Sequence, residues 1–136
     1  MIPAGSPKRT GPDQETSWAL YARAGGRCEI CNTDLTTGHA YSKHHRIPRG
    51  RGGTNVLSNL MLLCGTGTSG CHGMVESRRT IAYDNGWLVR TGHDPAEQLV
   101  RIHAVRLLNA GFFAPSGRPR VRVLLDDDGH YLQAAA

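Results

Sequence analysis

Four cysteines are the first residues in this chain whose types and spacing could do chemistry. Cys28 and Cys31 are separated by two residues, a spacing that lets one turn place both sulfurs on a single tetrahedral ion. Cys64 and Cys71 enclose six residues, three of them glycines, so a loop can bridge the wider gap. The spacing favours a four-cysteine structural zinc site that contributes directly to folding. Disulfides, or thiols that are merely buried or incidental, are the alternatives.

Two adjacent histidines form the second candidate group. His44 and His45 lie on a predicted strand, where neighbouring side chains point to opposite faces. One imidazole can therefore bind a metal ion while the other faces an attacking water and accepts its proton near neutral pH. His72 follows a zinc-type cysteine at an expected helix start, which strengthens this interpretation against a pair of surface histidines.

The net charge favours a polyanionic partner. Sixteen Lys and Arg against eleven Asp and Glu give a formal charge of +5. All but two of the basic residues are arginines, whose planar fork suits phosphate oxygens; a solvated basic surface is the alternative. No run of about 18 apolar residues predicts a membrane span, and no apolar core predicts a secretory signal. We therefore expect a soluble cytoplasmic protein with reduced cysteines.

A short helix is expected to position the first cysteine pair. Asp13 suits its N-cap, the helix should run to about Arg23, and the glycines at positions 25 and 26 end it. Residues 1–12 are rich in Pro, Gly, Ser and basic side chains, which predicts a flexible N-terminal arm.

The elements that carry the remaining candidates follow in the order strand, loop, strand, helix. They are expected at residues 40–47, 48–53, 60–63 and 72–84, so that residues 13–86 form one core. The glycine-rich loop 48–53 is expected to be irregular. Beyond Gly86, strands are expected at 87–89, 121–125 and 131–132, while 99–108 fits a helix or a strand. The chain should be α+β, with a small β-rich extension at 87–136 packed on the core.

Five fragments of this chain, taken together, resemble the HNH endonuclease family. They are Cys28-x-x-Cys31, Lys43-His-His-Arg-Ile-Pro48, Gly52-Gly53, Ser58-Asn-Leu-Met-Leu-Leu-Cys64 and Gly70-Cys-His72. The resemblance covers roughly residues 16–84 and implies a ββα-metal (His-Me finger) core with a four-cysteine zinc site. The segment 64–72 looks like small HNH proteins of bacterial viruses, some of which work beside the DNA-packaging machinery.

The resemblance also implies a role for each candidate residue. His44 and His72 would hold a catalytic divalent ion (Mg²⁺, Mn²⁺, Ni²⁺ or Zn²⁺), and His45 would be the general base. Asn59 would brace the loop that bears His45. Some relatives carry another histidine where this chain has Glu76, which could be a third ligand, although an exposed helix carboxylate is favoured here.

Five arginines surround the proposed site in sequence and are candidates for phosphate contacts: Arg46, Arg49, Arg51, Arg78 and Arg79. The resemblance thus implies a metal-dependent endonuclease acting on DNA, expected to be double-stranded, with terminase or other phage packaging proteins as possible partners and the host cytoplasm as its location. The alternative is a zinc-containing DNA-binding or interaction module that does not cleave.

Overall fold

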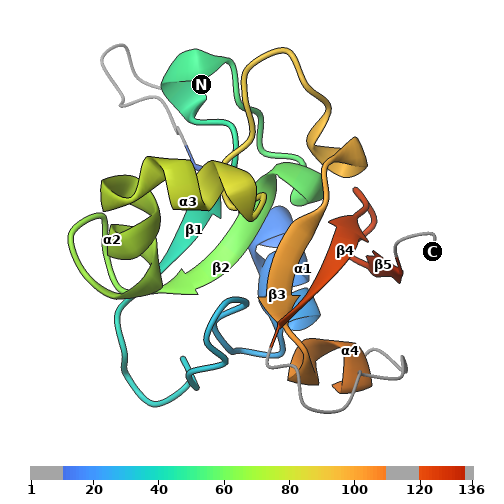
Figure 1. The fold of residues 1–136 in the computed structure, drawn as a ribbon. Coiled ribbons are helices and arrows are strands. Elements are labelled where there is room, and N and C mark those ends of the chain that lie inside the picture. Colours follow the sequence, from blue (N-terminus) through green and yellow to red (C-terminus); the bar gives the residue numbers. More distant parts are fainter. Residues whose placement is uncertain (1–10, 110–119, 134–136) are drawn as a thin grey trace, which may run out of the picture.

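The computed structural model describes residues 11–109 and 120–133, which form helices and two small sheets (Figure 1). The helices are α1 (Gln14–Ala24), α2 (Gly70–Ser77), α3 (Arg79–Asp84) and α4 (Val105–Asn109). The strands are β1 (Tyr41–His45), β2 (Leu60–Cys64), β3 (Val100–His103), β4 (Arg120–Leu125) and β5 (Tyr131–Gln133). Single turns of 3-10 helix occur at Arg49–Arg51, Leu57–Asn59 and Pro95–Glu97. The expected α+β class is confirmed.

Helix α1 begins and ends where its capping residues predict. Asp13 accepts a hydrogen bond from the backbone N–H of Thr16 at 2.8 Å, which satisfies one of the free N–H groups of the first turn. Gly25 adopts the left-handed conformation at φ 63°, and its N–H bonds to the carbonyl of Ala22. The predicted arm at 1–12 falls, except for its last two residues, outside the described residues.

The core is built around the antiparallel pair β1–β2. In β2 the residues from Leu60 to Leu63 are all buried, because α1 contacts the strand from one side and α2 from the other (Figure 1). A strand covered on both faces requires an uninterrupted apolar run, which is what this segment has. The register pairs His44 with Met61 and His45 with Leu60, so both histidines lie at the end of β1.

Three local expectations were wrong. The segment 48–53 contains a 3-10 turn, because the carbonyl of Pro48 accepts bonds from the N–H groups of Arg51 and Gly53. The predicted helix 72–84 is two helices, α2 and α3, separated at Arg78 by a non-helical backbone (φ −120°, ψ 65°). Residues 87–89 form no strand, because the N–H groups of residues 87 and 88 bond to one carbonyl near the end of α3.

The C-terminal strands form a separate antiparallel sheet in the order β3-β4-β5. The ambiguous segment 99–108 supplies both a strand, β3, and most of a short helix, α4. Buried contacts join this sheet to the core: the Tyr131 hydroxyl donates to a Glu29 carboxylate oxygen at 2.6 Å, and the Trp87 indole N–H donates to the Arg101 carbonyl at 2.7 Å. The predicted domain boundaries at residues 12 and 86 stay predictions.

None of the helices in the described ranges has the length and hydrophobicity that crossing a membrane requires.

Candidate functional site

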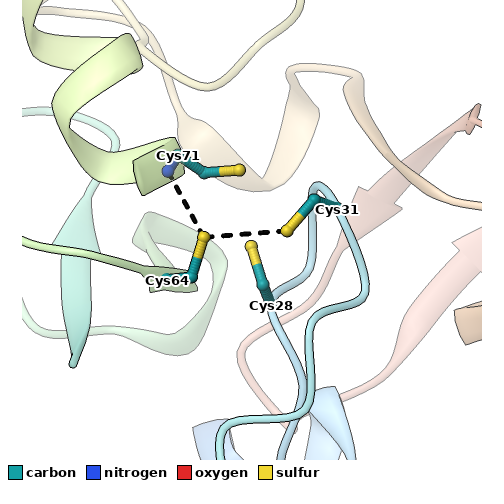
Figure 2. Close-up of side chains that lie close together, drawn as sticks. All are labelled: Cys28, Cys31, Cys64 and Cys71. Atoms are coloured by element: carbon teal, nitrogen blue, oxygen red, sulfur yellow. Dashed lines mark hydrogen bonds between the residues drawn. The ribbon is translucent and has the colours of Figure 1, made fainter. Parts of the chain in front are cut away.

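The four cysteines come together from three separate elements. Cys28 and Cys31 lie in the loop after α1, Cys64 ends β2, and Cys71 lies in the first turn of α2 (Figure 2). All four are free thiols, and their sulfurs lie within 4.8 Å of one another. The predicted cluster is confirmed, and its four thiol donors are the set that holds structural zinc in tetrahedral sites.

Two glycines allow the long spacing between Cys64 and Cys71. Gly65 and Gly70 both have positive φ, at 87° and 62°. A Cβ on Gly70 would lie 2.7 Å from the carbonyl oxygen of Cys64, so the loop can close only with glycine at this position. The closure lets the backbone N–H of Cys71 donate to the Cys64 sulfur at 3.3 Å. A six-residue gap therefore does not prevent a compact ligand set.

Crowding makes the protons of these thiols interdependent. A hydrogen bond from Cys71 lowers the pKa of Cys28 to about 5, and the same bond raises the pKa of Cys71. Burial raises the pKa of Cys64 to about 11. One thiolate is thus favoured, and the neighbouring thiols resist losing their protons. A cation bound between the sulfurs would be needed for all of them to ionise together.

His44 is buried and has a fixed ring orientation. Its Nε2 lies 2.6 Å from the carbonyl oxygen of Trp87, and because a carbonyl only accepts, Nε2 carries the proton. The lone pair is then on Nδ1, which lies 4.0 Å from Oε1 of Glu76. Burial lowers the pKa of His44 to about 4, so the ring is neutral at cellular pH. A neutral imidazole whose other nitrogen donates to a carbonyl is the usual form of a metal ligand.

His72 and Glu76 complete this second cluster from one face of α2. They are four residues apart, with His72 Nε2 3.7 Å from Glu76 Oε1, and the rings of His44 and His72 lie 5.3 Å apart. Burial lowers the pKa of His72. The buried Nδ1 of His72 has no hydrogen-bond partner among the described residues.

The donor atoms of His44, His72 and Glu76 lie within 4.8 Å of one another, which fits one divalent ion. The sequence favoured an exposed helix carboxylate for Glu76. The side chain is 38% exposed, yet its Oε1 is the atom that faces both imidazoles. Two nitrogens and one carboxylate oxygen leave further coordination positions open, as in catalytic metal sites.

His45 lies beside this cluster and has a partner that the sequence did not reveal. Its Nε2 is 2.7 Å from Oδ1 of Asn55, while Nδ2 of Asn55 donates to the carbonyl oxygen of Gly11 at 3.1 Å. The second contact fixes the amide orientation, so the first is an N–H donated by His45 to an amide oxygen. When the ring of His45 is neutral, its lone pair is therefore on Nδ1, which is the nitrogen able to accept a proton.

Asn59 spans the loop that follows β1. Its Oδ1 accepts from the N–H of Ile47 at 2.8 Å, and its Nδ2 donates to the carbonyls of Ile47 and Thr54 at 3.1 and 2.9 Å. This buried side chain links both ends of the loop after His45. The contacts are those expected of a residue that braces this loop, and its role in a reaction stays a prediction.

Three of the five candidate arginines lie next to the group formed by His44, His72 and Glu76, which we call the histidine–glutamate cluster. A pocket of about 340 Å³ is lined by His44, His45, Pro48, Arg49, Arg51, Glu76 and Arg79. Arg79 also approaches Oε2 of Glu76 at 3.4 Å, on the opposite side of the carboxylate from the imidazoles. Arg78 is exposed at the break between α2 and α3 and does not line this pocket.

Arg46 was wrongly expected to contact phosphate. The side chain is fully buried and donates hydrogen bonds at 2.8 Å to four backbone carbonyls, those of Gly86, Ser58, Pro95 and Gln98. Burial lowers the pKa of Arg46 to about 9. Arg46 follows the last residue of β1, so strand alternation does not by itself predict which way its side chain points. Arg46 fastens the core to the segment 86–98.

Comparison with protein families finds one match. Residues 28–78 match the family model described as HNH endonuclease. The matched segment contains all four cysteines, the histidine–glutamate cluster, His45 and Asn59. No curated protein and no solved structure matches the chain.

Proposed function

Because residues 28–78 match the HNH endonuclease family model, we propose that the protein is a metal-dependent endonuclease that hydrolyses phosphodiester bonds of DNA. The observation that carries the proposal is the proximity of two arrangements, since His45 lines the same pocket as His44 and Glu76. In the neutral ring of His45 the hydrogen bond to Asn55 leaves the lone pair on Nδ1, and the imidazoles of His44 and His72 face the carboxylate of Glu76 nearby. A module that only bound DNA would need neither.

His44, His72 and Glu76 would hold the catalytic divalent ion, which supplies positive charge that neutralises the scissile phosphate and stabilises the departing 3′ oxygen. The residues of the chain do the rest. His45 takes a proton at Nδ1 from the attacking water, while Asn55 keeps Nε2 protonated and the ring in place. Cleavage would leave 5′-phosphate and 3′-hydroxyl ends.

Arg49, Arg51 and Arg79 would bind phosphates that flank the cut. They line the pocket and carry positive charge, and phosphate contacts give affinity and salt dependence more than sequence preference. Arg78, exposed between α2 and α3, would extend this contact along the strand. Double-stranded DNA in the cytoplasm is the proposed substrate, and work beside phage packaging proteins such as a terminase rests on the resemblance alone.

The four cysteines would hold structural zinc, which joins the loop after α1 to β2 and α2. Cys71 and His72 are neighbours in the first turns of α2, so fixing Cys71 also fixes the helix that presents His72 and Glu76. The structural site would thereby set the geometry of the reactive one.

A plasmid nicking assay tests the proposal. Purified protein is incubated with supercoiled plasmid and Mg²⁺, Mn²⁺, Ni²⁺ or Zn²⁺, beside the variants His45→Ala and His130→Ala. General bases contribute about 10²- to 10⁴-fold, so His45→Ala should lose nicking to that extent. His130 is exposed on the turn before β5, and its variant should nick normally. Equal nicking by the parent and His45→Ala, or none with any ion, would overturn the proposal.

A further inference from the structure

A cleft of about 750 Å³ between α1 and β1 is lined by aromatic rings that the proposed reaction does not use. We call it the aromatic cleft and define it by Trp18, Tyr21, Tyr41 and Lys43. Trp18 is 68% exposed, the most exposed large hydrophobic side chain in the described part of the chain, and Tyr41 is 43% exposed. The rings of Tyr21 and Tyr41 lie 6.2 Å apart at 54°, so they form one wall.

Strand β1 connects this cleft to the catalytic pocket. Side chains alternate along a strand, so Tyr41, Lys43 and His45 share one face of β1 while His44 points to the other. The burial of the strand follows this alternation, with Tyr41 and Lys43 exposed and His44 buried. At about 3.4 Å per residue, Tyr41 lies roughly 14 Å along the strand from His45.

The segment before α1 makes the two sites neighbours. Gly11 accepts a hydrogen bond from Asn55, the residue that holds His45, and Pro12 lines the aromatic cleft. Only one peptide bond therefore separates the surroundings of His45 from the wall of the cleft. A bound strand that leaves the catalytic pocket along this face of β1 reaches the aromatic rings next.

We propose that the aromatic cleft binds an unpaired nucleobase of the DNA strand on which the catalytic pocket acts; this rests on the proposed function. Exposed aromatic faces stack bases of any sequence, and the ammonium of Lys43 suits the phosphate that follows. Bases within an intact duplex hide their faces, so only an unpaired base fits. The separation of roughly 14 Å along β1 places the unpaired base a few nucleotides from the cut. The preferred substrate class is DNA with single-stranded nucleotides beside the cut, as in flaps, gaps and branches.

Binding is measured without cleavage, in a His45→Ala background, by the fluorescence of tryptophan during titration with a short oligothymidylate or a blunt duplex of equal length. Trp87 is buried, so a change in emission reports Trp18. Oligothymidylate should quench the emission. A further Trp18→Ala change should weaken oligothymidylate binding, followed by anisotropy of a labelled strand, at least about fivefold while duplex binding stays unchanged. Trp18→Phe should retain the affinity, and Leu132→Ala, an exposed control on β5, should have no effect.

Three results would overturn the proposal. They are equal oligothymidylate affinity with and without the Trp18 ring, an equal loss for duplex and single strand, and Trp18 emission that acrylamide cannot quench in the free protein. The last result would mean that another part of the chain fills the cleft. A protein that never nicks plasmid would refute the proposed function and leave this binding result readable, because no step of the titration requires cleavage.

Discussion

The cysteine cluster and the histidine–glutamate cluster lie next to each other on α2 and differ in how complete they are. Four thiols from three elements surround one point and leave no position for a further ligand. His44, His72 and Glu76 supply three donors, and His44 and Glu76 line a pocket that is bordered by arginines. The difference fits the proposed division, in which one cluster holds the fold and the other admits a substrate.

Their surroundings differ in the same sense. The cysteine cluster adjoins the hydrophobic core, with Cys28 fully buried, whereas Glu76 is 38% exposed and contacts Arg79 as well as the imidazoles. A closed site contributes its binding energy to folding, and an open site must keep a position for a reacting group. Variants of the first should therefore change stability, and variants of the second should change metal affinity and cleavage.

The largest expected effect is the loss of folding in Cys28→Ser. Structural zinc contributes about 10 kcal/mol or more in small zinc domains, which equals or exceeds the total stability of a domain of this size. Circular dichroism should show an unfolded chain, and elemental analysis should show less than one tightly held zinc. A Cys28→Ser protein that is folded and zinc-free, with the parent's melting temperature, would refute the closed site.

Arg46→Gln should have the next largest effect, because it removes the donor from four backbone carbonyls whose hydrogen bonds are buried or part-buried. We expect a loss of more than about 3 kcal/mol in the free energy of unfolding by urea. Arg49→Gln removes an exposed arginine from the pocket rim and should stay within about 0.5 kcal/mol. Similar stabilities for the two variants would contradict the assignment of Arg46 to the scaffold.

Acid should lower the stability of the folded protein through protonation of His44 in the histidine–glutamate cluster. Burial lowers its pKa in the folded protein from 6.5 to about 4, so the unfolded chain binds the proton first as the pH falls. The contribution of the neutral ring is complete above about pH 6.5 and is lost progressively toward pH 4, up to about 3 kcal/mol. Urea unfolding of the parent and of His44→Asn is compared at each pH without added divalent ions. Both proteins would release zinc in acid, so the difference between them reports the contribution of His44. Parallel pH curves would show that His44 is not buried as a neutral ring.

Glu76→Gln should have a smaller effect, which is confined to metal binding by the histidine–glutamate cluster. The amide keeps the shape of the side chain and removes the charge, so Mn²⁺ affinity by calorimetry should fall about tenfold while zinc content and melting temperature stay unchanged. Glu97→Gln, an exposed change near the C-terminal sheet, serves as the matched control. Unchanged Mn²⁺ affinity in Glu76→Gln would limit the ligand set to the two histidines.

The residues that the sequence identified are those whose positions follow from local rules. A two-residue cysteine spacing, strand alternation at His44 and His45, and capping of α1 by Asp13 each depend on a few neighbouring residues, and the structure has all three. The α+β class followed from the same rules.

The errors and omissions depend on contacts between distant segments. Arg46 bonds to carbonyls as far away as Gln98, and no feature of a basic loop distinguishes such a residue from a phosphate contact. Asn55 is ten residues from His45, in a loop whose course no pattern predicts. The i, i+4 spacing of His72 and Glu76 was a usable signal, but only the approach of His44 from β1 gives that spacing a meaning.

The separation of a closed zinc site from an open catalytic site is tested most directly by mild chelation followed by metal addition. After dialysis against a weak chelator, the protein should keep about one zinc per chain and its circular dichroism spectrum, and should have lost plasmid nicking. Adding Mg²⁺ or Mn²⁺ should restore nicking without changing the zinc content. Nicking that survives chelation in full, or that disappears only together with the zinc and the fold, would contradict the account.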